Sequence, residues 1–574
     1  MESSMIKAQC DPFYASVVKR FGLEALHEAG FFDDGSPVGH DMTEKVDDRF
    51  LTTPLGKIRN TMHHHGAPAS CRRAVLVASG AFCPIHTGHL HMMESAKRAA
   101  ERRGWSVVGG FFAPDHDGYV SVKCGDEALS AAERVHLAQV ATEDSTWLAV
   151  DPWAALYLDR AVNFTDIVRR VARYLRFHLS QEIEVMFVCG GDNHGFSKAF
   201  LDHGHLIVVP RVGTRFPDEL QAQASVSERI LIAGDHLANH IASRSVRRGQ
   251  WDDLPPRVLF EFRKCVERKT VGSVRILVRD EEEWSVAPWK QQIGDALESA
   301  RSTFAVSLTE LLADSFRAGF FNASVTVSRI SLSDQCKVVR RMIDTFAIPV
   351  ISLDACIEGH YCIALSRRFE VTSGERCEGI FPRPGAAELV TQIDSIPSGA
   401  YVLMDDDIAT GGTIRALREL LPSRIEIQGV LSAQEVYTKD SLRTVECSEE
   451  SGLVDVVDLR DFLVGSREGG LVVRLPDGCV ARAPYLLPYV QNNRRMSLPL
   501  SEQLSFSRGV WELNRRFFQG LPVALTVADC PEPFRNLATA IGFTPETSMK
   551  ELCQWHLEQM IVEVKTQVPP HLPP

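Results

Sequence analysis

Short apolar runs alternate with amphipathic stretches in the first half of the chain, beginning at residue 72. The runs that predict strands are residues 72–80, 105–114, 182–192 and 205–213. Residues 89–104 and 257–269 instead carry apolar side chains at helical spacing. Strands that alternate with helices form parallel β-α-β units. The pattern therefore predicts an α/β fold with a Rossmann-like domain over residues 71–270.

A second alternating pattern covers residues 272–465 and predicts a second α/β domain over residues 271–480. Its candidate strands are residues 273–279, 323–332, 348–353, 361–366, 400–407 and 425–434. The remaining residues, 481–574, form a mixed C-terminal region, in which 500–519 and 548–565 have the spacing of helices.

The first seventy residues precede these patterns and predict an N-terminal helical extension. Residues 14–29 carry apolar side chains at helical spacing, and a loose polar stretch ending near His63, His64 and His65 follows. No cysteine or acidic ligand accompanies the three histidines at a defined spacing. We therefore interpret them as part of a solvated linker, and no metal-binding cluster of side chains is predicted.

Composition narrows the classes of partner. The length of 574 residues suggests about three domains, and the hydrophobic content of 45% is ordinary. A net charge of −12 argues against a nucleic-acid or anionic-membrane partner. The 14 cysteines are scattered, and no basic leader or long uncharged apolar stretch occurs. We expect a cytoplasmic protein with reduced thiols and small-molecule substrates, and the sequence leaves a homo-oligomer open.

A phosphate-binding motif follows the first strand, in the segment Ser79-Gly-Ala-Phe-Cys-Pro-Ile-His-Thr-Gly-His89. Gly80 permits a close backbone turn, and His86 and His89 fall on one side of the first helical turn. Helix N-terminal amides attract phosphate, and imidazoles add donors as charge moves to a leaving pyrophosphate. This arrangement predicts in-line nucleotidyl transfer, with His86 and His89 as the catalytic pair.

The motif belongs to a longer resemblance. It is followed in order by VVGGFFAPDHDGYVSVKCG, ERVHLAQVATEDSTWLAVDPW, VMFVCGGD, HLIVVPRVG and HIASRSVRR. Over residues 72–270 the chain thereby resembles the eukaryotic-type nicotinamide mononucleotide adenylyltransferases. The resemblance implies adenylyl transfer from ATP, with Mg²⁺, to nicotinamide or nicotinate mononucleotide. It assigns ATP and phosphate contacts to Gly80, Phe82, Lys123, Ser243 and Arg247, and pyridine nucleotide contacts to Trp153, Gly190 and Asp192.

Two positions depart from the family pattern. Arg244 stands where the family has a threonine, and Ala154 stands where it has a glutamate. The preference for amide or acid is therefore open. The alternative is a cytidylyltransferase-like enzyme that uses a nucleotide without a pyridine. Trp153 discriminates, because its indole should line the pocket if a pyridine ring stacks on it.

A second phosphate motif lies in residues 401–414, where an apolar strand runs into three aspartates and then Thr-Gly-Gly-Thr. Backbone amides at the helix start can hold a 5′-phosphate. The segment resembles the signature of type I phosphoribosyltransferases, which bind phosphoribosyl diphosphate with Mg²⁺. It implies catalytic roles for Asp406 and Asp407, and phosphoribosyl contacts from Thr410, Gly411, Gly412 and Thr413, with Arg367 as the candidate for the pyrophosphate side.

The two motifs together predict a two-headed enzyme. Its first half would make NAD or deamido-NAD, and its second half would bind phosphoribosyl diphosphate and transfer the phosphoribosyl group to a base. In the alternative, the second half is a sensor of phosphoribosyl diphosphate or a nucleotide that regulates the first half. Arg367 and Arg368 should face the Asp406–Thr413 loop if transfer occurs.

Overall fold

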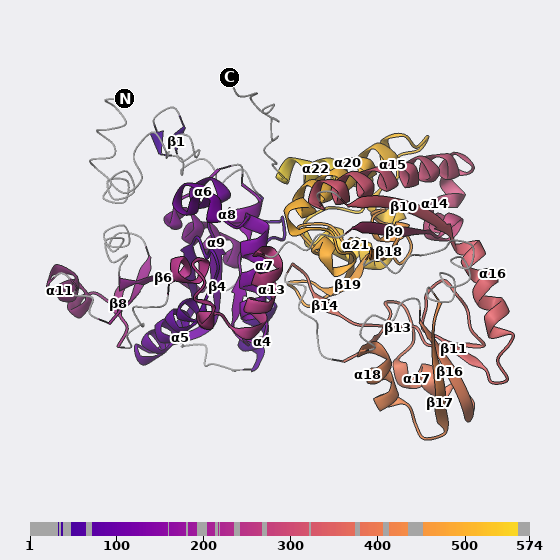
Figure 1. Cartoon of the computed structure of the whole chain (residues 1–574), viewed down its shortest axis with the longest axis horizontal. Helices are drawn as coiled ribbons and strands as arrows, with labels where there is room; N and C mark the ends of the chain where they lie inside the picture. Colours follow the sequence, from indigo (N-terminus) through magenta and orange to yellow (C-terminus); the bar gives the residue numbers. More distant parts are fainter. Residues whose placement is uncertain are drawn as a thin grey trace. The chain divides into compact units, whose positions relative to one another are not determined.

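The computed structural model divides the chain into two compact units, residues 1–268 with 556–574, and residues 269–555 (Figure 1). Each unit is described by itself. None of the described helices is both long and apolar enough to cross a membrane. The structure describes residues 32–33, 36–37, 47–64, 72–158, 160–179, 182–191, 204–212, 216, 218–234, 242–266, 272–320, 323–372, 379–405, 412–433 and 452–560.

A six-stranded parallel sheet forms the centre of the first unit, in the order β5-β4-β3-β6-β7-β8. The order reverses direction at β3, which is the arrangement of a doubly wound Rossmann-like sheet. The prediction of an α/β fold with parallel strands is thus confirmed. The strands are β3 (Arg72–Gly80), β4 (Trp105–Pro114), β5 (Leu148–Val150), β6 (Glu184–Gly190), β7 (His205–Val209) and β8 (Ile230–Ile232).

Helices cover this sheet and supply its core. Met93, Val135 and Phe262, from three helices, belong to one hydrophobic cluster with the strands. A fourth helix packs through Phe164, whose ring stacks on Phe187 of β6 at 5.0 Å. The helices are α5 (Thr87–Arg102), α6 (Asp117–Cys124), α7 (Ala131–Thr142), α8 (Trp153–Leu156), α9 (Phe164–Leu179), α11 (Asp218–Val226), α12 (Ser243–Arg247) and α13 (Pro256–Val266), with 3-10 turns η2 (Gly125–Glu127) and η4 (Trp251–Asp253).

Residues 47–64 depart from the loose polar stretch that the sequence predicts. Phe50 and Leu51 are fully buried, and α4 (Gly56–His64) buries Ile58 against β4. Lys57 donates from its Nζ to the carbonyls of Thr142 and Leu148 at 2.7 and 2.8 Å. The prediction of a loose polar stretch is therefore wrong for this segment, although His63, near the end of α4, is exposed. The predicted helix at 14–29 lies outside the described residues, and the short β1 (Phe32–Asp33) pairs with β2 (Ser36–Pro37).

The second unit contains a three-stranded parallel sheet in the order β10-β9-β18. Helices from distant parts of the chain share its core, because Phe517 of α20 lies 6.0 Å from both Trp289 and Phe304. The C-terminal region thus packs on residues 272–320. The elements are β9 (Ser273–Asp280), β10 (Ser324–Ser331), β18 (Gly452–Asp458), α14 (Glu282–Ile293), α15 (Ala296–Gly319), η5 (Leu459–Asp461), η6 (Asn492–Arg494), η7 (Leu500–Glu502), α20 (Gln503–Gln519), η8 (Val527–Asp529) and α21 (Glu532–Ala540), while α22 (Met549–Gln559) contributes to both units.

A separate four-stranded parallel sheet, in the order β12-β11-β16-β17, carries the second predicted motif. The single strand predicted at 361–366 is wrong: only its first part joins this sheet, and the rest is β13, which pairs antiparallel with β15. The elements are α16 (Leu332–Ile343), β11 (Val350–Ser352), β12 (Tyr361–Cys362), β13 (Leu365–Ser366), β15 (Phe381–Pro382), α17 (Leu389–Asp394), β16 (Gly399–Asp405), α18 (Gly412–Leu420) and β17 (Ile425–Ser432).

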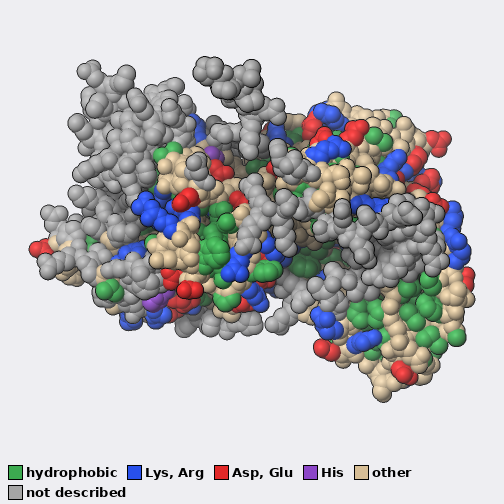
Figure 2. All heavy atoms as spheres, in the orientation of Figure 1, with side chains coloured by type: hydrophobic (Ala, Val, Ile, Leu, Met, Phe, Trp, Pro, Cys, Tyr) green, Lys and Arg blue, Asp and Glu red, His purple; other side chains and the backbone are tan. Residues whose placement is uncertain are grey.

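Apolar side chains reach the surface of this part of the second unit, around the position of β16 and β17 (Figure 2). Val390 of α17 is 70% exposed and Val430 of β17 is 41% exposed. A last small sheet joins β14 (Phe369–Glu370), β19 (Leu471–Arg474) and β20 (Val480–Ala483). Single exposed apolar residues are common on folded proteins, so these side chains assign no partner.

Candidate functional site

The predicted histidine pair lies where β3 passes into α5. His86 is the residue before the helix, and its backbone N–H donates to Nδ1 of His89 at 3.2 Å. The two imidazoles stack with their centroids 3.7 Å apart, and the edge of Phe82 packs on His89 at 5.0 Å. Phe82 has φ 41°, a left-handed backbone that turns the loop after Gly80. The loop thus holds both rings in one fixed stack at a helix N-terminus.

Burial and neighbouring cations keep the two imidazoles neutral. His86 is only 2% exposed, and burial, assisted by Arg211, lowers its pKa to about 4. Burial, His86, Arg211 and Lys123 hold the pKa of His89 well below its usual range. Nδ1 of His86 has no hydrogen-bond partner among the described residues. A neutral imidazole has one N–H donor, and this pair lies among positive charges that favour an anionic ligand.

Arg211 is a site residue that sequence reasoning missed. It follows β7, two residues beyond Val209, and its charge acts on both histidines. Parallel strands present the residues after their carboxyl ends at one edge of the sheet, where α/β proteins bind ligands. The basic residue two positions after the strand at 205–209 was the signal available in the sequence.

Side chains of helix α12 donate hydrogen bonds to the backbone of the histidine loop. Ser243 donates from its Oγ to the carbonyl of Pro84 at 2.9 Å, and Arg247 donates from Nη1 to the carbonyl of Cys83 at 2.6 Å. Arg247 also pairs with Glu127 through Nε at 2.9 Å. The structure therefore brings two predicted phosphate contacts beside the loop. Their hydrogen bonds to the carbonyls of Pro84 and Cys83 position the loop itself.

Lys123 lies on α6, on the exposed surface, with its ammonium 5.5 Å from the centroid of Tyr119. Its charge acts on both His89 and Asp115. Asp115 follows β4 and accepts from Ser79 Oγ at 2.8 Å, and burial raises its pKa. Asp115 is a second residue that the sequence analysis did not single out.

Arg134 positions this loop from the interior. Its guanidinium is fully buried and donates to the carbonyl of Ala81 at 3.1 Å, to that of Leu129 at 3.1 Å and to Asp117 at 2.8 Å. One cation thus ties the loop before His86 to α6, and it fixes the backbone that carries the histidines.

Of the three residues predicted to contact the pyridine nucleotide, the structure describes Trp153 and Gly190. Trp153 is fully buried, its Nε1 has no partner among the described residues, and the guanidinium of Arg170 lies 5.4 Å from its ring centroid. A stacking role would require this ring to become accessible, and it stays a prediction. Gly190 ends β6 at the carboxyl edge of the sheet, while Asp192 lies outside the described residues.

The lowered pKa of His86 predicts a pH dependence of stability. The folded protein binds this proton only near pH 4, whereas an unfolded histidine binds it near 6.5, so the stabilisation is complete above pH 6.5 and is lost as pH falls toward 4. At pH 5.0 the loss should be about 2 kcal/mol, since one pKa unit corresponds to about 1.4 kcal/mol. In urea unfolding of the full chain, His86→Gln should reduce the difference between pH 7.5 and pH 5.0 by that amount.

The matched control is His91→Gln, which replaces an exposed histidine of the same helix. This variant should keep the pH dependence of the wild type. An unchanged pH dependence in His86→Gln would contradict the assignment of a neutral, buried His86.

In the second unit, the predicted phosphoribosyl motif lies between a strand and a helix. Strand β16 ends at Asp405, and α18 begins at Gly412 with Thr413 in its first turn. Asp406, Asp407, Thr410 and Gly411 lie outside the described residues. The segment therefore joins a strand to a helix at the carboxyl edge of a parallel sheet, a common location for ligands.

The arginines proposed for pyrophosphate lie beside β13, which belongs to the antiparallel pair. The guanidinium of Arg368 lies 4.1 Å from the centroid of Phe381, on β15. The loop that Arg367 is predicted to face, residues 406–411, lies outside the described residues. The strands that neighbour β16 are β11 and β17.

The turn after β11 is occupied by its own aspartate. Asp354 accepts from the backbone N–H groups of Cys356 and Ile357 at 2.5 and 2.7 Å, and it pairs with Arg279 at 3.1 Å. Burial alone would raise the pKa of this carboxyl, but Arg279, Arg460 and the two N–H donors together lower it. The carboxylate of Asp354 thus already accepts hydrogen bonds from the backbone amides at which an anion could bind.

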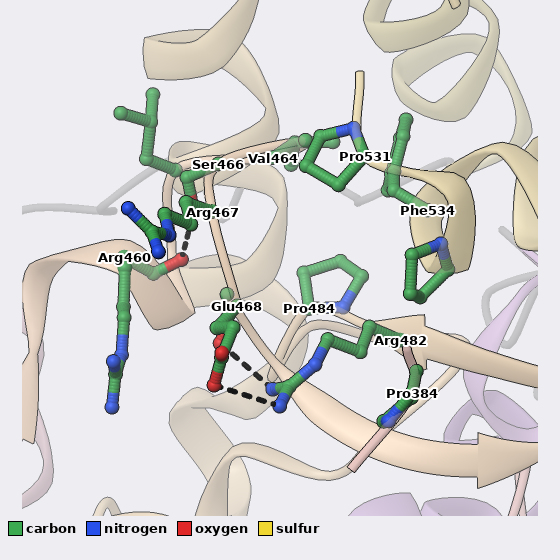
Figure 3. Close-up of a pocket in the computed structure, with 14 residues that line it drawn as sticks. Pro384, Arg460, Val464, Ser466, Arg467, Glu468, Arg482, Pro484, Pro531 and Phe534 are labelled. Atoms are coloured by element: carbon green, nitrogen blue, oxygen red, sulfur yellow. Dashed lines mark hydrogen bonds and ion pairs between the residues drawn. The ribbon is translucent and has the colours of Figure 1, made fainter. Parts of the chain in front are cut away.

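A cavity of about 120 Å³ lies elsewhere in the second unit, between a glycine-containing turn and four prolines (Figure 3). Arg482 faces Glu468 across it at 3.4 Å, and it also donates to the carbonyls of Glu468 and Gly470. Its donors are therefore used within the protein. The cavity is lined by Pro384, Arg460, Leu463, Val464, Gly465, Ser466, Arg467, Glu468, Gly469, Arg482, Pro484, Pro531, Pro533 and Phe534, none of which belongs to the predicted phosphoribosyl site.

Comparison with known proteins bears on the first unit. Residues 77–248 match the Cytidylyltransferase-like family. A nicotinamide/nicotinic acid mononucleotide adenylyltransferase of Oryza sativa subsp. japonica is 37% identical over 121 residues, which are 21% of this chain and 47% of that protein. The protein of that name from Arabidopsis thaliana is 36% identical over 121 residues, 21% and 49% of the two chains. The chain thus spans about half the length of these curated relatives.

Two further similarities are more limited. The nicotinamide/nicotinic acid mononucleotide adenylyltransferase 2 of Xenopus tropicalis is 38% identical over 81 residues, 14% of this chain and 25% of that protein. A structure titled UMP synthase, from Leishmania donovani, covers 70% of this chain and 92% of its own at 10% identity, with a TM-score of 0.11. That score is too low to support any argument about the second unit.

Proposed function

We propose that the first unit, an α/β domain of the cytidylyltransferase-like type, transfers an adenylyl group from ATP to nicotinamide or nicotinate mononucleotide. The products would be NAD or deamido-NAD and pyrophosphate. The observation that carries the proposal is the stacked pair of His86 and His89 at the start of α5, within the segment that matches the family. The names of the plant relatives support the choice of substrates.

The proposed adenylyl transfer requires little proton transfer. The nucleophile is the phosphate of the mononucleotide, which is already largely ionised near pH 7. Positioning and neutralisation of charge then carry most of the rate. His86 and His89 would donate to the triphosphate, while Lys123 and Arg211 would offset the charge that gathers on the leaving pyrophosphate.

Magnesium would accompany the triphosphate. The described residues contain no group of three or more histidine, cysteine or acidic side chains that could hold a metal ion. Mg²⁺ is commonly held by phosphate oxygens, water and one or two protein carboxylates. Asp115, beside Lys123, is the carboxylate that could contribute. The ion would neutralise phosphate charge, and the protein would orient the two substrates.

Product analysis tests this function directly. Purified full-length protein would receive ATP, MgCl₂ and either mononucleotide, and mass spectrometry would follow NAD, deamido-NAD and pyrophosphate. Formation of either dinucleotide supports the proposal, and the ratio of the two rates gives the pyridine preference. Turnover of ATP or CTP with a phosphate acceptor that lacks a pyridine, and none with either mononucleotide, would favour the alternative enzyme.

For the second unit, we propose binding of phosphoribosyl diphosphate or a nucleotide 5′-phosphate at the turn between β16 and α18. The strand-to-helix arrangement at Asp405 and Gly412 supports a phosphate site. Asp354 accepts from backbone N–H groups in the turn after the neighbouring strand β11, so these groups are not available to a pyrophosphate. This favours binding of the ligand without transfer of its phosphoribosyl group. We therefore favour the sensor, with phosphoribosyl transfer as the alternative.

The double variant Asp406→Asn, Asp407→Asn should abolish binding of phosphoribosyl diphosphate, because the ribose hydroxyls would lose their carboxylate acceptors. Calorimetric titration of the full chain measures this binding. Synthesis of NAD from the mononucleotide should continue in the variant. Unchanged binding would refute the proposed site, and release of pyrophosphate by the wild type in the presence of a base would restore the transferase.

A further inference from the structure

Two cysteines meet beside the histidine loop. Cys83 lies in that loop, three residues before His86, and Cys124 is the last residue of α6. Cys83 belongs to a small hydrophobic cluster with Ala81 and Val120, and the half-buried Cys124 packs against this cluster. The two thiols therefore lie in one part of the fold although 41 positions separate them in the sequence.

Contacts fix Cys83 in place. Its Sγ accepts from the backbone N–H of Leu129 at 3.3 Å and lies 3.7 Å from the carbonyl of Glu127. Its own carbonyl accepts from Arg247 at 2.6 Å. Cys83 is 1% exposed, whereas Cys124 is half-buried at the end of its helix. A small oxidant would thus reach Cys124 first, with Cys83 held beside it.

Charge makes Cys124 the more reactive thiol. The neighbouring Cys83 thiol, together with Arg247, Lys123 and Arg134, lowers the pKa of Cys124 to about 6. Cys124 and burial raise the pKa of Cys83. One thiol is then a thiolate near neutral pH while its partner keeps its proton, which is the arrangement of an attacking and a resolving cysteine.

We propose that Cys83 and Cys124 are a redox-active dithiol that hydroperoxides convert reversibly into a disulfide. The Cys124 thiolate attacks a peroxide oxygen, breaks the O–O bond and becomes a sulfenic acid, with hydroxide or alkoxide leaving. Cys83 then attacks the Cys124 sulfur, the S–S bond forms, and the hydroxyl group of the sulfenic acid leaves as water with the thiol proton. An external dithiol reverses the reaction by exchange.

The disulfide would join the loop before His86 to the helix that carries Lys123. Small displacements of reacting groups can lower a rate about 100-fold. Oxidation should therefore inhibit adenylyl transfer, and reduction should restore it. This effect on turnover rests on the proposed function of the first unit. Formation of the disulfide does not, and the two are measured separately.

The first measurement is chemical. Alkylation of the wild type with iodoacetamide between pH 5 and 8, followed by peptide mass spectrometry, should show Cys124 reacting with a midpoint near pH 6. At pH 6 it should react about tenfold faster than an ordinary thiol, because its larger thiolate fraction outweighs its lower nucleophilicity. Cys265, a half-buried thiol in α13, is the internal reference. A Cys124 no faster than Cys265 would overturn the proposal.

The second measurement follows oxidation of the full chain by hydrogen peroxide. A non-reducing peptide map should contain the Cys83 peptide linked to the Cys124 peptide. Cys124→Ser should remove this link, whereas Cys83→Ser should leave Cys124 as a sulfenic acid that dimedone traps. Cys265→Ser should form the link as the wild type does. A disulfide to any other cysteine, or unmodified Cys124 beside other oxidised cysteines, would overturn the proposal.

Activity separates the two claims. If peroxide forms the link and dithiothreitol restores NAD synthesis, both stand, and Cys124→Ser should then resist inhibition. If the link forms but even the reduced protein makes no NAD or deamido-NAD, the proposed function fails and the dithiol remains. If the reduced protein is active and no link forms, only the dithiol fails.

Discussion

His89→Ala should lower kcat for NAD or deamido-NAD synthesis by a factor of about 100 to 1,000, which corresponds to roughly 2.7–4 kcal/mol of transition-state stabilisation. The histidine stacks on His86 and is held by Phe82 and by the backbone N–H of His86, so its place is fixed before ATP binds. A donor placed in advance acts mainly on the transition state, and kcat should fall more than KM rises. Steady-state kinetics with saturating ATP measure both quantities.

The matched control is His91→Ala on the same helix. His91 is exposed, and its loss should leave kcat within about twofold of the wild type. Thermal unfolding of both variants separates catalysis from folding. If His89→Ala retained wild-type turnover while folded, the histidine pair would have no catalytic role, and the assignment of the first unit would depend on sequence similarity alone.

Arg279→Met should destabilise the second unit by about 3–5 kcal/mol. The guanidinium is fully buried and donates to both carboxylate oxygens of Asp458 at 2.7 and 2.9 Å, and it pairs with Asp354 at 3.1 Å. Burial alone would raise the pKa of Asp458, and Arg279, Arg460 and Arg495 together hold it far below its usual range. Without Arg279, two buried carboxylates lose their main counter-charge. Urea unfolding at pH 7 measures the loss.

Two comparisons make this test specific. Arg317→Ala removes a surface pair with Asp314, in which both side chains are more than half exposed, and should change stability by less than about 1 kcal/mol. Adding Asp458→Asn to Arg279→Met should recover part of the lost stability, because the amide carries no charge. A loss in Arg279→Met no larger than in Arg317→Ala would mean that the buried network contributes little.

The strongest local patterns in the sequence gave the most accurate predictions. The strand at 105–114 has its predicted bounds, and α5 begins two residues before the predicted 89–104, because long apolar runs and helical spacing depend on neighbours close in the chain. The parallel direction of the strands in the first sheet follows from their alternation with helices. The position of the histidine loop between a strand and a helix was predictable for the same reason, since the motif lies within eleven consecutive residues.

Features that depend on distant partners were missed. Strand β18 has Asp455 at its centre and lacks a continuous apolar run, and it forms by pairing with β9, far away in the sequence. Arg211 acts on the two histidines, and Asp115 on Ser79 and Lys123, only because separate strands end at the same edge of the sheet. The aspartate in the turn after β11 acts through Arg279, 75 positions away. No local pattern encodes such pairings.

The contact between α4 and β4 carries an evolutionary consequence. A methyl group on Gly109 would come within 2.4 Å of the Ile58 side chain, so the absence of a side chain at one position is matched to the bulk of the other. In homologous chains these two positions should co-vary: a glycine at 109 goes with a branched residue at 58, and a larger residue at 109 with a small one at 58. Ile58 lies outside the segment that defines the family, 77–248, so this constraint would escape any profile restricted to that segment.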